Sequence, residues 1–144
     1  MSRTIHQTLP LAVCAAIIQL QGKILLTQRL ANKPHAGLWE FPGGKIEPGE
    51  SPHQSLRREI REELNIEISV GPVLESAYHH YDCGNVLIFA YRCDWLSGTI
   101  QHLEVATHHW VAPRQLGNYQ ILPADLPIIA KLLAESNLQG KITK

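Results

Sequence analysis

Apolar residues occur along this chain in short runs that glycine and proline interrupt. Residues 11–19 (LAVCAAIIQ) and 23–30 (KILLTQRL) are apolar and rich in strand-forming types, and they flank Gln21 and Gly22. Glycine there allows the positive φ of a tight turn, so we expect two strands paired as a β-hairpin. Four later runs also have strand character: residues 66–70, 73–79, 86–93 and 107–112.

A helix is predicted for residues 52–64. Ser51 is a preferred N-cap residue, Pro52 fits the first helical position, and Gln54 stands where a capping box places its second member. Asn65 tolerates the left-handed conformation that ends many helices. Both ends of this helix are therefore marked in the sequence.

A long loop is predicted before this helix, and a second helix is predicted near the end of the chain. Residues 31–49 are dense in glycine and proline and predict a long loop, which in a compact domain is usually functional. A final helix is expected at residues 124–136, where apolar residues recur at helical spacing. The order strands, helix, strands, helix predicts an α/β fold in which a mixed sheet lies between helices.

Length and charge limit the possible functions. The 144 residues fit one domain, expected to span 1–144 with a flexible tail at 1–9. Thirteen basic residues balance thirteen acidic ones, so no global field would hold a nucleic-acid polymer. No apolar run reaches the roughly 18 residues that span a bilayer, and we expect no membrane association. Three cysteines without C-x-x-C spacing indicate a reducing cytoplasm.

Three carboxylates of the predicted helix share one face. Glu59, Glu62 and Glu63 are three and four positions apart and lie beside an apolar stripe. Because these carboxylates repel one another, we expect a cation to lie between them. Clustered hard oxygen ligands are typical of Mg²⁺ sites, and Mn²⁺ can substitute. For the helix taken alone, the alternative is a solvated acidic face relieved by the arginines of the same helix.

The loop before the helix favours the metal site over the solvated acidic face. Gly44, five residues, Glu50, seven residues and then REIREELNI (58–66) form a spacing that closely resembles the Nudix box, G-x5-E-x7-R-E-U-x-E-E-x-G-U, where U is a bulky aliphatic residue. Every specified position except one agrees. Asn65 stands where the family has glycine, and asparagine is the mildest replacement for a residue that closes a helix in the left-handed conformation.

The resemblance to the Nudix hydrolase family implies an α/β/α sandwich and hydrolysis of a nucleoside diphosphate linked to another group. It implies that Glu59, Glu62, Glu63 and a backbone carbonyl of the Gly43-Gly44 region bind the metal. It also implies that Arg58 and Glu50 orient the helix and its carboxylates.

Further stretches are similar to the MutT-like branch of this family: TQRL (27–30), LWEFPGGKIEPGES (38–51) and ILPADLPIIAKLL (121–133). The resemblance implies a nucleoside triphosphate as substrate, split into a monophosphate and diphosphate. No obligate protein partner is inferred from the sequence. An oxidised nucleotide such as 8-oxo-dGTP is the leading expectation. CTP, dCTP or 5-methyl-dCTP is the alternative, and a non-catalytic nucleotide-binding module is the alternative from another class.

Four residues outside the box are candidates on the same resemblance, each with a plainer alternative. Glu104 is expected to bind metal or act as a base, or else to be an exposed loop acid. Arg29 is expected to bind phosphate, or to form a surface ion pair. Phe41 is expected to line the base pocket rather than the core. Asp125 is either a helix N-cap or a reader of the base, where an ionised carboxylate would accept hydrogen bonds from donor-bearing edges.

Overall fold

A computed structural model describes residues 9–143 of the chain. Strand β1 (Leu11–Leu20) turns through Gln21 and Gly22, both at positive φ, into β2 (Lys23–Gln28). This confirms the predicted hairpin, although the two strands pair only next to the turn. Apart from its last residue, the tail expected at residues 1–9 lies outside the described residues.

The predicted loop at 31–49 contains two short strands. Strand β3 (Trp39–Glu40) pairs with β2, and β4 (Gly43–Lys45) pairs with β1. Neither strand has a sequence signal, because glycine and proline dominate the segment and each strand depends on a partner elsewhere in the chain.

Strand β1 is the centre of a seven-stranded mixed sheet with the order β3-β2-β1-β6-β5. It pairs in parallel with β6 and antiparallel with β2 and β4. The remaining strands are β5 (Ile66–Tyr81), β6 (Gly84–Gly98) and β7 (Thr107–Val111), of which β7 pairs with β2. The runs at 66–70 and 73–79 are thus one strand, whose register shifts around Gly71 and Pro72 because proline cannot donate to the ladder.

Helix α2 (Pro52–Leu64) has the predicted bounds. The Ser51 hydroxyl accepts from the Gln54 backbone N–H at 3.2 Å, and the Gln54 side chain accepts from the Ser51 N–H at 2.9 Å. Asn65 ends the helix at φ 58°. The fully buried side chains of Leu56, Ile60 and Leu64 pack α2 against one face of the sheet.

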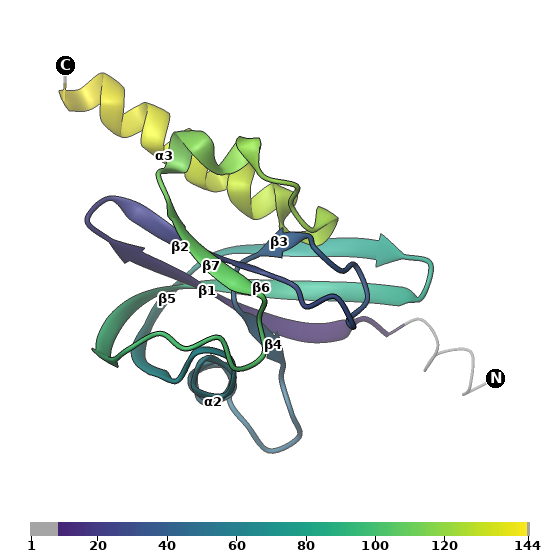
Figure 1. The fold of residues 1–144 in the computed structure, drawn as a ribbon. Helices are drawn as coiled ribbons and strands as arrows, with labels where there is room; N and C mark the ends of the chain where they lie inside the picture. The colour runs from purple at the N-terminus through teal and green to yellow at the C-terminus, as the bar shows by residue number, and fades with distance from the viewer. Residues whose placement is uncertain (1–8, 144) are drawn as a thin grey trace.

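The opposite face of the sheet is covered by the C-terminal segment (Figure 1). Two 3-10 helices, η1 (Pro113–Asn118) and η2 (Pro123–Asp125), precede helix α3 (Leu126–Thr143). The helix predicted at 124–136 therefore begins two residues later and runs further. The sheet between α2 and α3 confirms the predicted mixed α/β sandwich, and within residues 9–143 no helix has the length and apolarity to cross a bilayer.

Candidate active site

Strand β4 and helix α2 touch at Gly44 and Glu59. A Cβ added to Gly44 would lie 2.4 Å from Glu59 Cδ, and one added to Gly43 would lie 2.0 Å from the Cys14 carbonyl oxygen. The glycine pair is therefore required by close approach on two sides, to the carboxylate on one and to β1 on the other.

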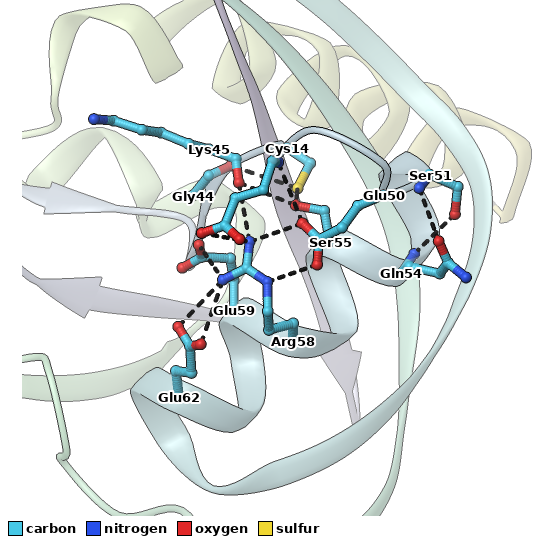
Figure 2. A network of polar contacts seen from close by, with 11 residues as sticks. Cys14, Gly44, Lys45, Glu50, Ser51, Gln54, Ser55, Arg58, Glu59 and Glu62 are labelled. Atoms are coloured by element: carbon cyan, nitrogen blue, oxygen red, sulfur yellow. Dashed lines mark hydrogen bonds and ion pairs between the residues drawn. The ribbon is translucent and has the colours of Figure 1, made fainter.

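Arg58 holds the carboxylates of the Nudix box in place (Figure 2). Its guanidinium donates to Glu50 at 2.7 and 3.0 Å, to Glu59 at 3.0 Å, to Glu62 at 3.3 Å and to the Lys45 carbonyl at 3.2 Å. The hydrogen bonds from Arg58 lower the pKa of Glu50. Arg58 and Glu50 therefore lie where residues that orient the carboxylate helix would have to lie.

Glu63 and Glu104 add two more carboxylates on the cavity side of α2. Glu63 is buried, and the backbone N–H groups of Leu103 and Glu104 donate to its carbonyl at 3.0 and 3.4 Å, which brings Glu104 to the helix. Burial and the charges of Glu40, Glu59 and Glu104 raise the pKa of Glu63 well above its usual range. Burial, opposed by Arg58, also raises the pKa of Glu59. Arg58 offsets part of the negative charge at Glu59, whereas the charges that act on Glu63 are those of other carboxylates.

The two glycine carbonyls of β4 point in opposite directions. That of Gly44 faces β1, whereas the Lys45 carbonyl faces α2, where it accepts from Ser55 and Arg58. Because successive carbonyls of an extended strand alternate in direction, the Gly43 carbonyl also faces α2. It is therefore the carbonyl of the predicted pair that lies on the carboxylate side.

These oxygen donors fit a hard divalent cation in chemistry, because carboxylates and a backbone carbonyl are the oxygen ligands that Mg²⁺ prefers. In residues 9–143 no three His, Cys, Asp or Glu side chains already converge as a ligand set. Glu62 accounts for part of this, since its half-exposed carboxylate is paired with Arg58. A bound cation would need the carboxylates to turn towards one another.

A cavity of about 480 Å³ begins at this cluster. It extends from β4 and α2 past the loop after β2 to the end of β5 and to η2. The predicted site residues that line it are Arg29, Gly43, Gly44, Glu59, Glu63, Glu104 and Asp125. The carboxylate cluster and the segment before the last helix thus share one cavity, although they are far apart in sequence.

Arg29 lies in this cavity and is also ion-paired. Its Nη1 is 3.0 Å from Glu40, and its Nε donates to the Pro34 carbonyl at 2.7 Å. The ion-pair alternative is therefore observed, on a residue that lines the cavity. Glu40 is a site residue without a sequence signal of its own, because it is a polar position between the aromatic Trp39 and Phe41.

Asp125 is buried, with 3% of its surface exposed, and its carboxylate accepts from the Phe41 backbone N–H at 3.1 Å. This side-chain bond goes to the segment before β4 and not to the first turn of α3. Burial and the charge of Glu40, opposed by the Phe41 N–H and Arg29, raise the pKa of Asp125 to about 8. The raised pKa favours the protonated form of Asp125, which can donate as well as accept, over the ionised acceptor that the sequence predicts.

Phe41 differs from its expected position. Phe41 is 3% exposed and belongs to the core on the α3 side of the sheet. It is not among the described residues that line the cavity. The general tendency of phenylalanine to pack in the core prevails here. Phe41 contributes a backbone N–H at the end of the cavity rather than a ring.

Comparison with known proteins agrees with this geometry. The model of the NUDIX domain matches residues 8–132, and the chain belongs to the NUDIX family. The CTP pyrophosphohydrolase of Escherichia coli K12 is 43% identical over 122 residues, covering 85% of this chain and 90% of that one. The 8-oxo-dGTP diphosphatase of Haemophilus influenzae is 35% identical over 126 residues, covering 87% and 93%. The protein is accordingly a NUDIX hydrolase.

Solved structures share the fold. The E. coli ORF135 protein superposes with a TM-score of 0.80 at 41% identity, covering 90% of this chain and 92% of that one. The MutT protein of Methanosarcina mazei Go1 gives a TM-score of 0.81 at 22% identity, covering 90% and 97%, a likeness in fold alone.

Proposed function

We propose that this protein is a Mg²⁺-dependent nucleoside triphosphate pyrophosphohydrolase, which converts a (d)NTP and water into a (d)NMP and diphosphate. The observation that carries the proposal is that one cavity has a carboxylate cluster at one end and the buried Asp125 carboxyl at the other. Such a cavity can hold the phosphates and the base of one nucleotide at the same time.

The residues proposed to hold the cation are Glu59, Glu62, Glu63, Glu104 and the Gly43 carbonyl. When bound, Mg²⁺ would neutralise the phosphates and make water a better nucleophile. The cation would also offset the repulsion that raises the pKa of Glu63.

The side chains around the cation have separate tasks in this proposal. Glu63 is proposed to accept a proton from water, because it is a buried carboxylate that lines the cavity at the carboxylate cluster. Arg58 keeps Glu59 turned towards β4. Arg29, held by Glu40, presents the rest of its guanidinium to a phosphate.

Two bases are candidates, each supported by a different relative. We place a cytosine nucleotide first, because the 43% identical relative is named a CTP pyrophosphohydrolase. An oxidised guanine nucleotide is second, supported by the 8-oxo-dGTP diphosphatases. A protonated Asp125 has a donor and an acceptor side by side, and cytosine presents the complementary pair at its amino group and ring nitrogen.

The test is a panel of CTP, dCTP, 5-methyl-dCTP, 8-oxo-dGTP and dGTP, compared by kcat/KM with Mg²⁺. We expect diphosphate as the released product. Release of single phosphate would contradict the reaction, and binding without turnover at any metal concentration would favour a nucleotide-binding module. With oxidised guanine preferred, the role would be sanitation of the nucleotide pool in support of DNA repair.

The setting proposed for this reaction is the cytoplasm, with no nucleic-acid polymer, membrane or obligate protein partner. It rests on the zero formal net charge and on cysteine usage.

A further inference from the structure

A buried polar contact lies behind the Gly44–Glu59 pair (Figure 2). Ser55 is on α2 one turn before Glu59 and is 0% exposed. Its hydroxyl donates to the Lys45 carbonyl at 3.1 Å, and the Cys14 thiol donates to the hydroxyl at 3.6 Å. A serine inside a helix commonly bonds back to its own helix, but this one bonds across to the neighbouring strand.

The Lys45 carbonyl is held by two donors of α2, and they are not equivalent. Arg58 divides its guanidinium among several carboxylates besides this carbonyl. Ser55 bonds to the strand from a buried position, and its hydroxyl contacts the Lys45 carbonyl and the Cys14 thiol. Ser55 is thus the donor that rearrangement of the carboxylates disturbs least.

Two successive carbonyls of β4, those of Gly44 and Lys45, are held from opposite sides of the strand. On the β1 side, the Gly44 carbonyl lies 3.5 Å from the Cys14 sulfur, whose single S–H is shared between this carbonyl and the Ser55 hydroxyl. On the α2 side, the Ser55 hydroxyl donates to the Lys45 carbonyl. The carbonyl of Gly43 directly precedes these two and faces the same helix as that of Lys45, so its distance from Glu59 depends on how closely β4 is held to α2.

We propose that Ser55 is a positioning residue for the cation site, which holds β4 against α2 so that the Gly43 carbonyl and the Glu59 carboxylate can bind one ion. The inference rests on the proposed function, because it places a cation between these two groups. Mg²⁺ accepts oxygen ligands only within a narrow range of about 2.0–2.1 Å. A small outward movement of β4 therefore weakens binding without unfolding the helix.

The test compares two serine variants of the same helix. Ser55→Ala removes the bond to β4 and leaves a residue that favours helix. Ser51→Ala is the matched control, since it removes the N-cap bond to Gln54 and does not touch β4. Binding of Mn²⁺ alone, without nucleotide, is measured by the electron paramagnetic resonance signal of the free ion. The melting temperature (Tm) and the Mg²⁺ concentration for half-maximal activity are measured in parallel.

We expect Ser55→Ala to weaken Mn²⁺ binding and to raise the Mg²⁺ requirement by roughly three- to tenfold, with a small change in Tm and an unchanged nucleotide KM at saturating Mg²⁺. Ser51→Ala should show the reverse, a lower Tm with an unchanged cation requirement. Ser55→Cys, with a weaker donor, should be intermediate.

Equal Mn²⁺ affinity in the wild type and Ser55→Ala overturns the inference. If Ser55→Ala does not fold, the same comparison is made on Ser55→Cys, and equal affinity there has the same meaning. A wild type that binds Mn²⁺ but hydrolyses no nucleoside triphosphate contradicts the proposed function, while the dependence of Mn²⁺ affinity on Ser55 is still decided by the titration.

Discussion

The carboxylate of Asp125 accepts a hydrogen bond from the backbone N–H of Phe41, 84 positions earlier in the chain. Phe41 is followed by Pro42 and then by the glycine pair of β4. Asp125 is therefore bonded directly to the segment that leads into the Gly43 carbonyl, which is proposed as a cation ligand. The backbone segment from Phe41 to Gly43 thus connects the Asp125 end of the cavity with the carboxylate end.

The raised pKa of Asp125 predicts a pH-dependent choice of base. Below pH about 8 the carboxyl both donates and accepts, and above it the group only accepts. A base that needs the donor should lose about ten- to hundredfold in kcat/KM, since an unsatisfied buried group costs about 1–3 kcal/mol. Asp125→Asn keeps a donor at every pH. The ratio of variant to wild-type kcat/KM for CTP should rise from pH 7 to 9, and a constant ratio would speak against Asp125 as base reader.

The same carboxyl predicts an effect on stability with a definite sign. The folded protein keeps a proton on Asp125 that the unfolded chain releases near the ordinary pKa of 3.8, so stability falls as the pH rises from there towards about 8. Asn has no such dependence. The Tm of Asp125→Asn relative to wild type should increase by several degrees between pH 5 and 8. The exposed Asp82→Asn is the control and should show no such trend.

Glu63→Gln should make the protein more stable and inactive. The substitution removes a buried charge that Glu40, Glu59 and Glu104 repel, so the Tm without metal should rise, and more at pH 8 than at pH 5. Diphosphate release should fall at least about a hundredfold. Glu67→Gln, on an exposed acid paired with Arg61, should leave activity unchanged. A Glu63→Gln protein with full activity would remove this residue from the site.

Gly44→Ala should reduce activity by more than about tenfold, because the added methyl group must displace the Glu59 carboxylate. Gly117→Ala is the matched control, since a Cβ there meets nothing within 4 Å. Steady-state diphosphate release measures both variants. Equal activity of the two would mean that the contact between β4 and Glu59 has no part in the reaction.

Mg²⁺ should stabilise the protein in the absence of nucleotide. At ten times the dissociation constant, binding contributes about 1.4 kcal/mol, or roughly 3–5 °C in Tm for a chain of this length. Activity should disappear in EDTA and return with Mg²⁺ or Mn²⁺. NaCl at equal ionic strength is the control, because screening alone relieves part of the carboxylate repulsion. An equal Tm shift with NaCl would count against a specific site.

Local signals in the sequence are sufficient for the carboxylate helix. Its cap at Ser51, its end at Asn65 and its buried stripe depend on neighbours within a few positions, and all three are confirmed. The hairpin turn at Gln21 and Gly22 is confirmed for the same reason. The helix also carries the spacing of the family motif, so the fold class and the family could be predicted before any coordinates.

The sequence does not reveal contacts that depend on distant partners. The bond from Phe41 to Asp125, the pairing of Arg29 with Glu40 and the resulting pKa values require the folded chain. The motif context predicts the Phe41 ring at the base, whereas the ring is buried in the core. The catalytic and binding roles of the site residues stay predictions.

Strand β1 forms its longest pairing with β6, and Leu11 lies opposite Val86. A ribosome that has added Asn65 has therefore made the whole carboxylate helix and both site glycines, but not the strand that fixes β1 along its other edge. Such long-range parallel pairing is slow compared with helix formation. We expect the acidic helix to appear early in refolding, and cation binding to appear only with the late, sheet-closing step.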